Sequence, residues 1–529
     1  MDRRTPGILL AIILALSVAV PAPALALKYG GILKSMARRS PPSLSSHDET
    51  TFDTSWPMSA VYNNVVFFDL FEPIESLDTV IPELAERWAW NDAYTLLTFT
   101  LRKGVTWHDG TPFTARDVKH TFDVVRGASE QRLKLNPRQG WYANVKNITT
   151  RGDHEVAFHL ERPQPALLLL LATGYSPVYP AHVPVQRLRT ETMGTGPFKL
   201  TEYKRDVVLK VRKNPDYFVK GRPYLDGVDY IIIKKAATRT AALQAGQLDV
   251  SQPTTVGQKV YENLKAARPN MKFQKTYLAS YLNIVINSKQ PPFDNQKVRQ
   301  AVNLAIDRHA YARSIQPGYL PGGFMMPPPG GVWGISGQDL SEVPGYGDPA
   351  AEKEKARQLM RELGYSAANP LRFKLSTRST RNYTRAGTWA LGELKQVYME
   401  PELEVVETVN WFGRMARRDF AIAMNATGLG ADDPDVNYFE NYTCTSKRNY
   451  SNYCNPQIEK LFVRQSSMID QAERLKLVHE IERRMVNDVA RISIAFRVEY
   501  NAHQSYVMNF VGHQSIHSHA RFQDLWLDR

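Results

Sequence analysis

An α/β fold divided among two or three domains is predicted for this chain by three observations. Short apolar runs with strand character alternate with amphipathic helical patterns over its whole length. Its 529 residues are more than one hydrophobic core usually holds. The composition, with 43% hydrophobic and 22% charged residues, is that of a globular rather than a disordered protein.

The N-terminal segment, residues 1–26, has the order of a secretory signal peptide. Arg3 and Arg4 precede an apolar run at 8–20, and small residues follow up to Ala26. The run is short for a membrane span, and no later segment has the apolar length that a span needs. We therefore expect cleavage after Ala26, export to the periplasm and, because no cysteine lies at this site, no lipid anchor.

Local patterns place the secondary structure. Asp294 is expected to cap a helix whose apolar residues continue to Ile306. Asp348 and the proline after it are expected to start another helix, with Gly364 as its stop, and a third helix is expected at 473–488. Strands are expected at 96–101, 155–160, 207–211, 228–234, 281–286, 371–375, 403–409, 420–425 and 492–496.

The segment 317–347 is rich in glycine and proline and predicts a long irregular loop. Loops of this length are either functional or surface excursions. Phe324, Met325, Met326 and Trp333 would be poor choices for open solvent. We therefore expect the loop to pack over the body of the protein or to line a cleft.

The two cysteines, Cys444 and Cys454, are expected to form a disulfide that closes a surface loop. Export places them in an oxidising compartment, where such pairs form and persist. Closing a loop this short contributes roughly 2–3 kcal/mol in the chain-entropy account. Two thiolates by themselves cannot make a structural zinc site.

The net charge of +13 points to an acidic partner rather than to nucleic acid. The cations are scattered, and no basic run with interleaved aromatic residues stands out. In an exported protein, an anionic ligand or an acidic partner surface fits this balance. A solvated basic surface without a partner is the alternative.

No motif of an enzyme or a metal site stands out, and we expect no catalytic residue, cofactor or metal. Phosphate-binding glycine loops, paired zinc-binding histidines and serine nucleophile elbows are all absent from the sequence. His513, His517 and His519 could hold a transition metal only if they converged. No carboxylate or thiolate completes that set, so we expect these histidines at exposed loop or strand positions.

The segment 427–439 is the best local candidate for a ligand site. It follows a predicted strand and carries Asp432, Asp433 and Asp435 among glycines. Ligand sites are common where a strand opens into such a loop. The alternative is a turn that caps the next helix. We expect one aspartate to face the ligand and the others to cap.

Six blocks in order resemble the extracytoplasmic solute-binding proteins of dipeptide, oligopeptide and nickel ABC importers. The similarity covers nearly the whole mature chain. The blocks are LRKGVTWHDGTPFTARDVKHTFD at 101–123, MGTGPFKLTEYKRD at 193–206, NPDYF at 214–218, RPYLDGVDYIIIKKAATRTAALQAGQLDV at 222–250, NSKQPPFDNQKVRQAVNLAIDR at 287–308, and the stretch from DPDVNYFENYTC to NYCNPQIEKLF at 433–462.

The resemblance implies a two-lobed periplasmic-binding-protein fold of type II with an extra inserted domain, three domains in all. One lobe would comprise 27–64, 191–279 and 498–529. Residues 65–190 would form the inserted flanking domain, and 280–497 the other lobe. The disulfide between Cys444 and Cys454 also has a counterpart in dipeptide-binding relatives.

The resemblance also implies a binding site. An aspartate at the Asp432 position binds the peptide ammonium in relatives, and Trp411 matches an aromatic wall of their cavity. Leu429 stands where relatives carry a second tryptophan, so an aromatic lid is missing there. Arg378, Arg381 and Arg385 lie where a relative uses an arginine for the ligand carboxylate; a solvated basic turn is the alternative. The stretch 36–48 corresponds to loops that line the cleft.

The function implied by the resemblance is capture of a peptide or peptide-like solute and its delivery to an ABC permease in the inner membrane. The protein would act as a monomer and perform no chemistry. The main alternative is a receptor for a non-peptide solute, such as an opine-like or sugar-linked anionic compound, an oligosaccharide or a metal chelate. A secreted hydrolase and a purely sensory receptor are further alternatives.

Overall fold

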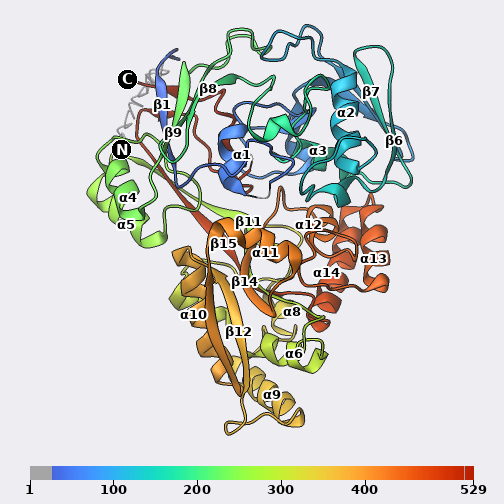
Figure 1. Cartoon of the computed structure of the whole chain (residues 1–529), viewed down its shortest axis with the longest axis vertical. Coiled ribbons are helices and arrows are strands. Elements are labelled where there is room, and N and C mark those ends of the chain that lie inside the picture. The colour runs from blue at the N-terminus through green and yellow to red at the C-terminus, as the bar shows by residue number, and fades with distance from the viewer. Residues whose placement is uncertain (1–26, 50, 518) are drawn as a thin grey trace, which may run out of the picture.

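The computed structural model describes residues 27–49, 51–517 and 519–529. The expected signal peptide, residues 1–26, lies outside this described part. The molecule is elongated, with two lobes stacked along its long axis (Figure 1). None of the helices in the described part of the chain combines the length and the apolar character needed to cross a membrane.

The upper lobe contains a four-stranded sheet in the order β1-β10-β9-β8. β1 pairs in parallel with β10, while β10-β9 and β9-β8 are antiparallel. The pairing of β1 with β10 joins the start of the described part of the chain to a segment beyond residue 220. The elements of this part are β1 (Ile32–Ala37), β8 (Phe198–Lys204), β9 (Val208–Lys213), β10 (Gly227–Ile232), α1 (Phe52–Met58), α4 (Ala236–Gln244) and α5 (Gln258–Ala267).

The segment between β1 and β8 adds a second sheet beside the first, in the order β4-β5-β7-β6. All three pairings in this sheet are antiparallel. Two predicted strands, 96–101 and 155–160, are confirmed with the same bounds. The elements are β2 (Val66–Phe68), β3 (Val80–Pro82), β4 (Ala85–Trp90), β5 (Leu96–Leu101), β6 (Val145–Thr150), β7 (Glu155–Leu160), α2 (Ala115–Arg126) and α3 (Leu167–Ala172).

The lower lobe is built on a mixed five-stranded sheet in the order β13-β12-β14-β11-β15. Helices α6, α9 and α10 pack on it and form their own hydrophobic cluster with its strands. The elements are β11 (Lys272–Ile286), β12 (Leu371–Arg378), β13 (Met399–Val406), β14 (Ile422–Gly428), β15 (Ile492–His503), α6 (Gln296–Ala305), α7 (Arg308–Ala310), α8 (Gly337–Ser341), α9 (Pro349–Glu362), α10 (Arg381–Lys395), α11 (Thr408–Arg417), α12 (Pro434–Asn441), α13 (Pro456–Ser466) and α14 (Gln471–Asn487).

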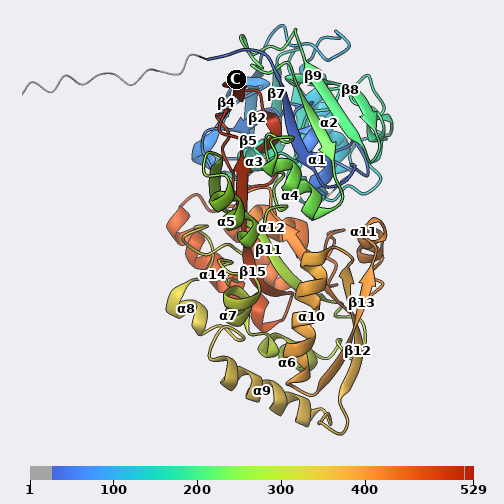
Figure 2. The ribbon, with the colours of Figure 1, turned by 90° about the vertical axis from the view of Figure 1, so that its left-hand side faces the viewer.

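Two long strands, β11 and β15, connect the lobes. They run side by side from the lower sheet into the upper lobe (Figures 1 and 2). Their lower halves belong to the five-stranded sheet, whereas their upper halves pair with each other, from Lys272 opposite His503 to Tyr277 opposite Val498. His503 also bridges to Val250 of the upper lobe. A paired ribbon of this kind is suited to bend between two rigid bodies.

Most local predictions are confirmed, with shifted ends. Asp348 caps α9 by accepting a hydrogen bond from the Ala351 amide at 2.9 Å, and Gly364 follows the helix with a φ of 83°. The expected cap of α6 is wrong by one residue, because Asn295 rather than Asp294 accepts from the Lys297 amide. The strand expected at 403–409 ends at Val406, since α11 begins at Thr408 and takes its last residues.

The loop at 317–347 packs on the body of the protein, as predicted. Phe324, Met325 and Met326 are completely buried. The carboxylate of Glu482, on α14, accepts hydrogen bonds from the amides of Phe324, Met325 and Ile335. Three such bonds to one buried carboxylate hold two distant parts of the loop against α14. The loop includes only one short helix, α8.

Candidate ligand-binding cavity

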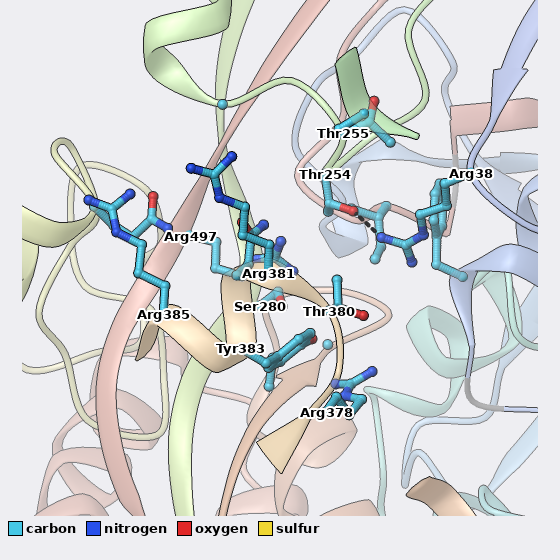
Figure 3. A pocket seen from close by; sticks show the side chains of 18 of the residues that line it. Arg38, Thr254, Thr255, Ser280, Arg378, Thr380, Arg381, Tyr383, Arg385 and Arg497 are labelled. Carbon is cyan, nitrogen blue, oxygen red and sulfur yellow. Dashed lines mark hydrogen bonds between the residues drawn. The ribbon is translucent and has the colours of Figure 1, made fainter. Parts of the chain in front are cut away.

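A cavity of about 890 Å³ lies between the two lobes. Its upper wall comes from the segment after β1 and from α4 and α5. The connecting strands contribute Ser280 and Arg497, and its lower wall comes from the end of β12 and the start of α10. In Figure 3, Arg38 lies on one side of the cavity, Arg381 and Arg385 lie on the opposite side, and Arg378 lies at the bottom. The cavity therefore has side chains from both lobes.

The lining of this cavity is strongly basic. Glu262 is its one acidic side chain among the described residues. Because the cations come from segments far apart in the sequence, folding concentrates a charge that looks scattered along the chain. The basic lining residues are Arg38, Arg39, Arg239, Lys259, Arg378, Arg381, Arg385, Arg448 and Arg497.

Arg38 and Arg39 of the upper lobe share one carboxylate. Arg38 Nε lies 2.8 Å from Asp53 Oδ1, and Arg39 Nε lies 2.9 Å from Asp53 Oδ2. Arg38 also donates to Thr254 Oγ1 at 2.8 Å. Asp53 sits in the first turn of α1, where Thr51 caps the helix. Two cations against one carboxylate leave a net positive charge at this wall.

Arg378 ends β12 in the lower wall and is only 8% exposed. Its Nη2 donates to Asn425 Oδ1 at 3.1 Å, whereas its Nε has no hydrogen-bond partner in the described structure. Burial lowers the pKa of Arg378, and Arg39, Arg38 and Arg497 lower it further, against an opposing effect of Tyr383. This guanidinium therefore lies in a site that opposes its positive charge.

Tyr383 lies among these cations. Its ring is 3.8 Å from the guanidinium carbon of Arg378. Burial by itself would raise the pKa of this phenol, but Arg378, Arg497, Arg38 and Arg39 together lower it below the ordinary value. The lowered pKa of Tyr383 indicates that the positive potential of the arginines outweighs the effect of burial at this position. An anion placed here would be stabilised by the same potential.

In another part of the wall, two arginines share one buried carboxylate. Glu440 forms a buried ion pair with Arg448, and Arg138 Nε lies 3.6 Å from the same carboxylate oxygen. The guanidinium carbon of Arg138 lies 3.5 Å from the centroid of the Tyr175 ring. The hydroxyl of Tyr175 in turn bonds to Nε2 of His517, a further cavity residue. This network fixes side chains from the segment between β5 and β8, from α12 and from the C-terminal segment against one another.

The expectation of exposed histidines is wrong for His513 and His517, each of which is 2% exposed. His517 Nδ1 bonds to Ser55 Oγ at 2.8 Å, and His513 Nε2 bonds to the Leu70 carbonyl oxygen at 3.2 Å. Both side chains therefore belong to the packing between segments. The side chain of His519 lies outside the described structure. No cluster of metal-ligating side chains occurs among the residues that the structure describes.

The structure brings three of the expected ligand residues to the cavity. Arg378, Arg381 and Arg385 all line it. Asp432 does not line it; its Oδ2 accepts from the Val332 amide at 3.1 Å, and burial raises its pKa to about 7. Asp432 therefore supports the loop at 317–347.

Trp411 and Leu429, also expected at the ligand, are completely buried and do not line the cavity. Trp411 Nε1 donates to Asn425 Oδ1 at 3.3 Å, the same oxygen that Arg378 contacts. It thus lies directly behind Arg378. The amide of Leu429 donates to the Ala279 carbonyl at 2.7 Å and so fixes the end of β14 to β11.

Of the other aspartates of this loop, Asp433 caps α12, as expected, whereas Asp435 anchors the helix through its carboxylate. Asp433 caps the helix by accepting from the Asp435 amide at 2.8 Å. Arg474 donates to both carboxylate oxygens of Asp433 at 2.8 and 2.9 Å. Asp435 is completely buried and accepts from Ser466 Oγ at 2.6 Å. The loop thus has a structural role that its composition alone could not distinguish from ligand binding.

Sequence reasoning missed several cavity residues. Arg38 and Arg39 lie within the stretch 36–48, which the resemblance assigned to the cleft, and two adjacent arginines directly after a strand were the available signal. Arg239 and Arg497 lie in a helix and a strand whose sequences carry no local sign of a site. Their role depends on which segments meet across the cleft.

The expected disulfide between Cys444 and Cys454 is present, with a Cα–Cα separation of 4.6 Å. It closes the segment that follows α12. That segment also carries Arg448, so the crosslink lies close in sequence to a cavity residue.

The chain is similar over most of its length to peptide-binding proteins. It is 25% identical over 495 residues to the probable di/tripeptide-binding protein 5 of Pseudomonas aeruginosa, covering 87% of this chain and 90% of the relative. It is 26% identical over 474 residues to the oligopeptide-binding protein AppA of Bacillus subtilis, covering 84% and 82%. A glutathione-binding protein GsiB of Salmonella choleraesuis is 29% identical over 312 residues, covering 57% and 56%.

Solved structures share the two-lobed fold. The periplasmic binding protein DppA of Helicobacter pylori, in complex with the peptide STSA, has a TM-score of 0.82 at 22% identity and covers 95% of this chain and 99% of its own. AgaA from A. tumefacien R10, in complex with agropinic acid, has a TM-score of 0.81 at 21% identity, covering 94% and 99%. These likenesses establish the periplasmic-binding-protein fold. The family model of bacterial extracellular solute-binding proteins, family 5 (middle), matches residues 79–449, and the chain therefore belongs to this family.

Proposed function

We propose that this protein is the receptor of an ABC importer, which captures a peptide or peptide-like solute between its lobes and delivers it to a membrane permease. Membership of a solute-binding family supports a receptor that binds its solute without chemical change. Its relatives are named for binding dipeptides, tripeptides or oligopeptides. We further propose that the mature chain works as a monomer in the periplasm.

The observation that carries this proposal is the cavity between the lobes. Its volume of about 890 Å³ lies within the ~300–1,000 Å³ of sites for small organic ligands. Side chains of both lobes line it, so a bound solute would touch both walls at once. Bending of the ribbon formed by β11 and β15 would open the cleft for entry and release.

The charge of the cavity suggests how a peptide would be oriented. A carboxylate placed at Arg378 would face a fixed guanidinium that has an unused Nε donor. Such a charge-assisted hydrogen bond contributes roughly 1.5–3 kcal/mol. Arg381 and Arg385 would extend the positive region along α10. Ligand contacts of Asp432, Trp411 and Leu429 stay predictions from the resemblance.

A second candidate ligand class is favoured by the same basic lining. An opine-like or sugar-linked anionic compound would use the arginines without needing a site for a peptide ammonium. The solved relative AgaA, which holds agropinic acid, is similar in fold. This candidate retains the receptor function and changes only the solute.

Native mass spectrometry of the mature protein, purified from a periplasmic extract, tests the proposal. A bound peptide or amino-acid conjugate, released unchanged on denaturation, is the expected result. Turnover of peptide or ester substrates by the purified protein would contradict a receptor and favour a secreted hydrolase. A released solute without any amino-acid part would favour the second ligand class.

A further inference from the structure

Like charges face one another across the cleft. Arg38 and Arg39 belong to the upper wall, Arg378 to the lower wall and Arg497 to the connecting strand β15, and all four line the cavity. These four guanidinium groups are close enough to influence the same phenol, that of Tyr383. Closure of the lobes therefore brings cations together.

The protein itself supplies little compensating charge. In the part of the chain that the structure describes, none of Arg239, Arg378, Arg381, Arg385 and Arg497 forms an ion pair with an acidic side chain. Asp53 is already shared by two arginines. Burial raises the pKa of the Glu499 carboxyl, two residues from Arg497, to about 8, whereas, against the effect of burial, Tyr319, Tyr383 and Glu499 raise the pKa of Arg497, so Arg497 is better compensated than Arg378.

A buried, uncompensated guanidinium is costly, and arginine cannot release its proton to avoid the cost. Arg378 is 8% exposed and has only an amide oxygen as a polar partner. Three ring systems surround it, at 3.8 Å for Tyr383, 5.3 Å for Phe412 and 5.8 Å for Trp411. These rings orient the guanidinium but do not neutralise it. The missing counter-charge must come from the cleft.

We infer that the cavity selects solutes with at least two anionic groups, one of which is held between Arg38 and Arg39 of the upper lobe and Arg378 of the lower lobe. This inference rests on the proposed function and specifies its ligand class. The second group would lie along α10, where Arg381 and Arg385 line the cavity. Both carboxylates and phosphates match the planar donor fork of arginine.

A neutral zwitterionic peptide fits this cavity poorly. It offers one carboxylate, and its ammonium would enter a region where cations already outnumber acids. An anion between the walls changes the interaction across the cleft from repulsion to attraction. Anionic solutes therefore favour the closed form, and neutral ones do not.

Two isosteric tripeptides test the inference by calorimetry at low salt. Asp-Ala-Asp and Asn-Ala-Asn have the same shape and differ by two negative charges. We expect Asp-Ala-Asp to bind at least about tenfold more tightly, which is the lower range for one charge-assisted contact. The preference should shrink as ionic strength rises, because salt screens partly exposed charges. A tripeptide with phosphoserine in place of one aspartate distinguishes phosphate from carboxylate recognition.

Arg378→Gln should raise the Kd for Asp-Ala-Asp at least about tenfold, because it removes one charge-assisted contact whether Arg378 holds the terminal or a side-chain carboxylate. Arg372→Gln is the matched control, since Arg372 lies on the same strand but is exposed and pairs with Glu400 at 2.7 Å. Thermal unfolding of both variants verifies that they fold. Equal affinity of the two tripeptides for the wild type, or an unchanged affinity of Arg378→Gln for Asp-Ala-Asp, would overturn the inference.

If neither tripeptide binds, the proposed peptide specificity fails instead. The same comparison is then made with an amino acid N-linked to a sugar acid and with the diamide of that conjugate. Tighter binding of the dianionic conjugate would support the inference for a non-peptide solute. Equal binding, or none, of the two conjugates would overturn it.

Discussion

The guanidinium carbon of Arg378 lies 3.8 Å from the centroid of the Tyr383 ring, and this stacking joins the end of β12 to the first turn of α10. The ring holds a buried cation in one orientation toward the cleft. Asn425 and Trp411 complete its support from below. The lower wall of the cavity is thus preorganised by aromatic packing, which lowers the entropy lost when a ligand binds.

Replacing Tyr383 should therefore weaken anion binding through Arg378. Tyr383→Leu removes a cation–π contact worth about 0.5–2 kcal/mol and should raise the Kd for Asp-Ala-Asp several-fold. Tyr383→Phe keeps the ring and should bind nearly as well as the wild type. Isothermal titration calorimetry measures both. Equal affinity in the leucine variant would show that the stacking does not position Arg378.

Asp432→Asn tests the ligand role that the resemblance assigns to Asp432. Contact with a ligand ammonium predicts a Kd about tenfold higher for a free-amine tripeptide. The N-acetylated tripeptide should be unaffected. Asparagine retains an oxygen that can accept from the Val332 amide, so the loop contact survives. An equal change, or none, for both peptides would restrict Asp432 to holding the loop.

Glu440→Gln should destabilise the protein strongly. The carboxylate lies between Arg448 and Arg138, and its side chain is completely buried. Its loss leaves two buried cations without a counter-charge, which costs about 3–5 kcal/mol. Urea unfolding measures the change. Glu473→Gln, which removes an exposed pair with Lys476, is the control and should cost less than about 1 kcal/mol.

Reduction of the disulfide should lower stability moderately. Cys444 and Cys454 are separated by 10 positions, and a loop of this size contributes about 2–3 kcal/mol in the chain-entropy account. The Cys444→Ser/Cys454→Ser double variant should therefore unfold at a lower urea concentration. Added reductant should shift the wild type toward the variant and leave the variant unchanged. A double variant as stable as the oxidised wild type would contradict this expectation.

Acid should destabilise the protein through buried histidines. Burial lowers the pKa of His47, His108 and His503 to about 4 from the ordinary value of 6.5. Because the folded state favours the neutral ring, this stability is present above pH 6.5 and is lost as the pH falls toward 4. Each group contributes at most about 3 kcal/mol.

Urea unfolding at pH 7 and pH 4.5 measures this loss. His108→Gln should make the loss of stability smaller, because glutamine takes up no proton between pH 7 and pH 4.5. Its amide can still donate to the Gly196 carbonyl that His108 contacts at 3.1 Å. His182→Gln, at an exposed position, is the control. An identical pH dependence in wild type and His108→Gln would exclude His108 as a source.

Local sequence patterns determined much of the fold. The strands at 96–101 and 155–160 have the predicted bounds, and Asp348 caps its helix, because alternation and capping act over a few residues. The disulfide followed from two cysteines in a chain that is expected to be exported. The order of the six sequence blocks identified the family. Most of these blocks build the scaffold that the family shares, so they do not specify the ligand.

The binding site was decided by the tertiary structure. Arg38 and Arg378 are distant in sequence and meet only because β11 and β15 place one lobe against the other. Asp432 lies in a segment with the composition of a ligand site, but its carboxylate accepts a hydrogen bond from the Val332 amide because the loop at 317–347 packs against it. Short-range patterns encode strands, helices and caps, whereas the charge of a cleft depends on which distant surfaces face each other across it.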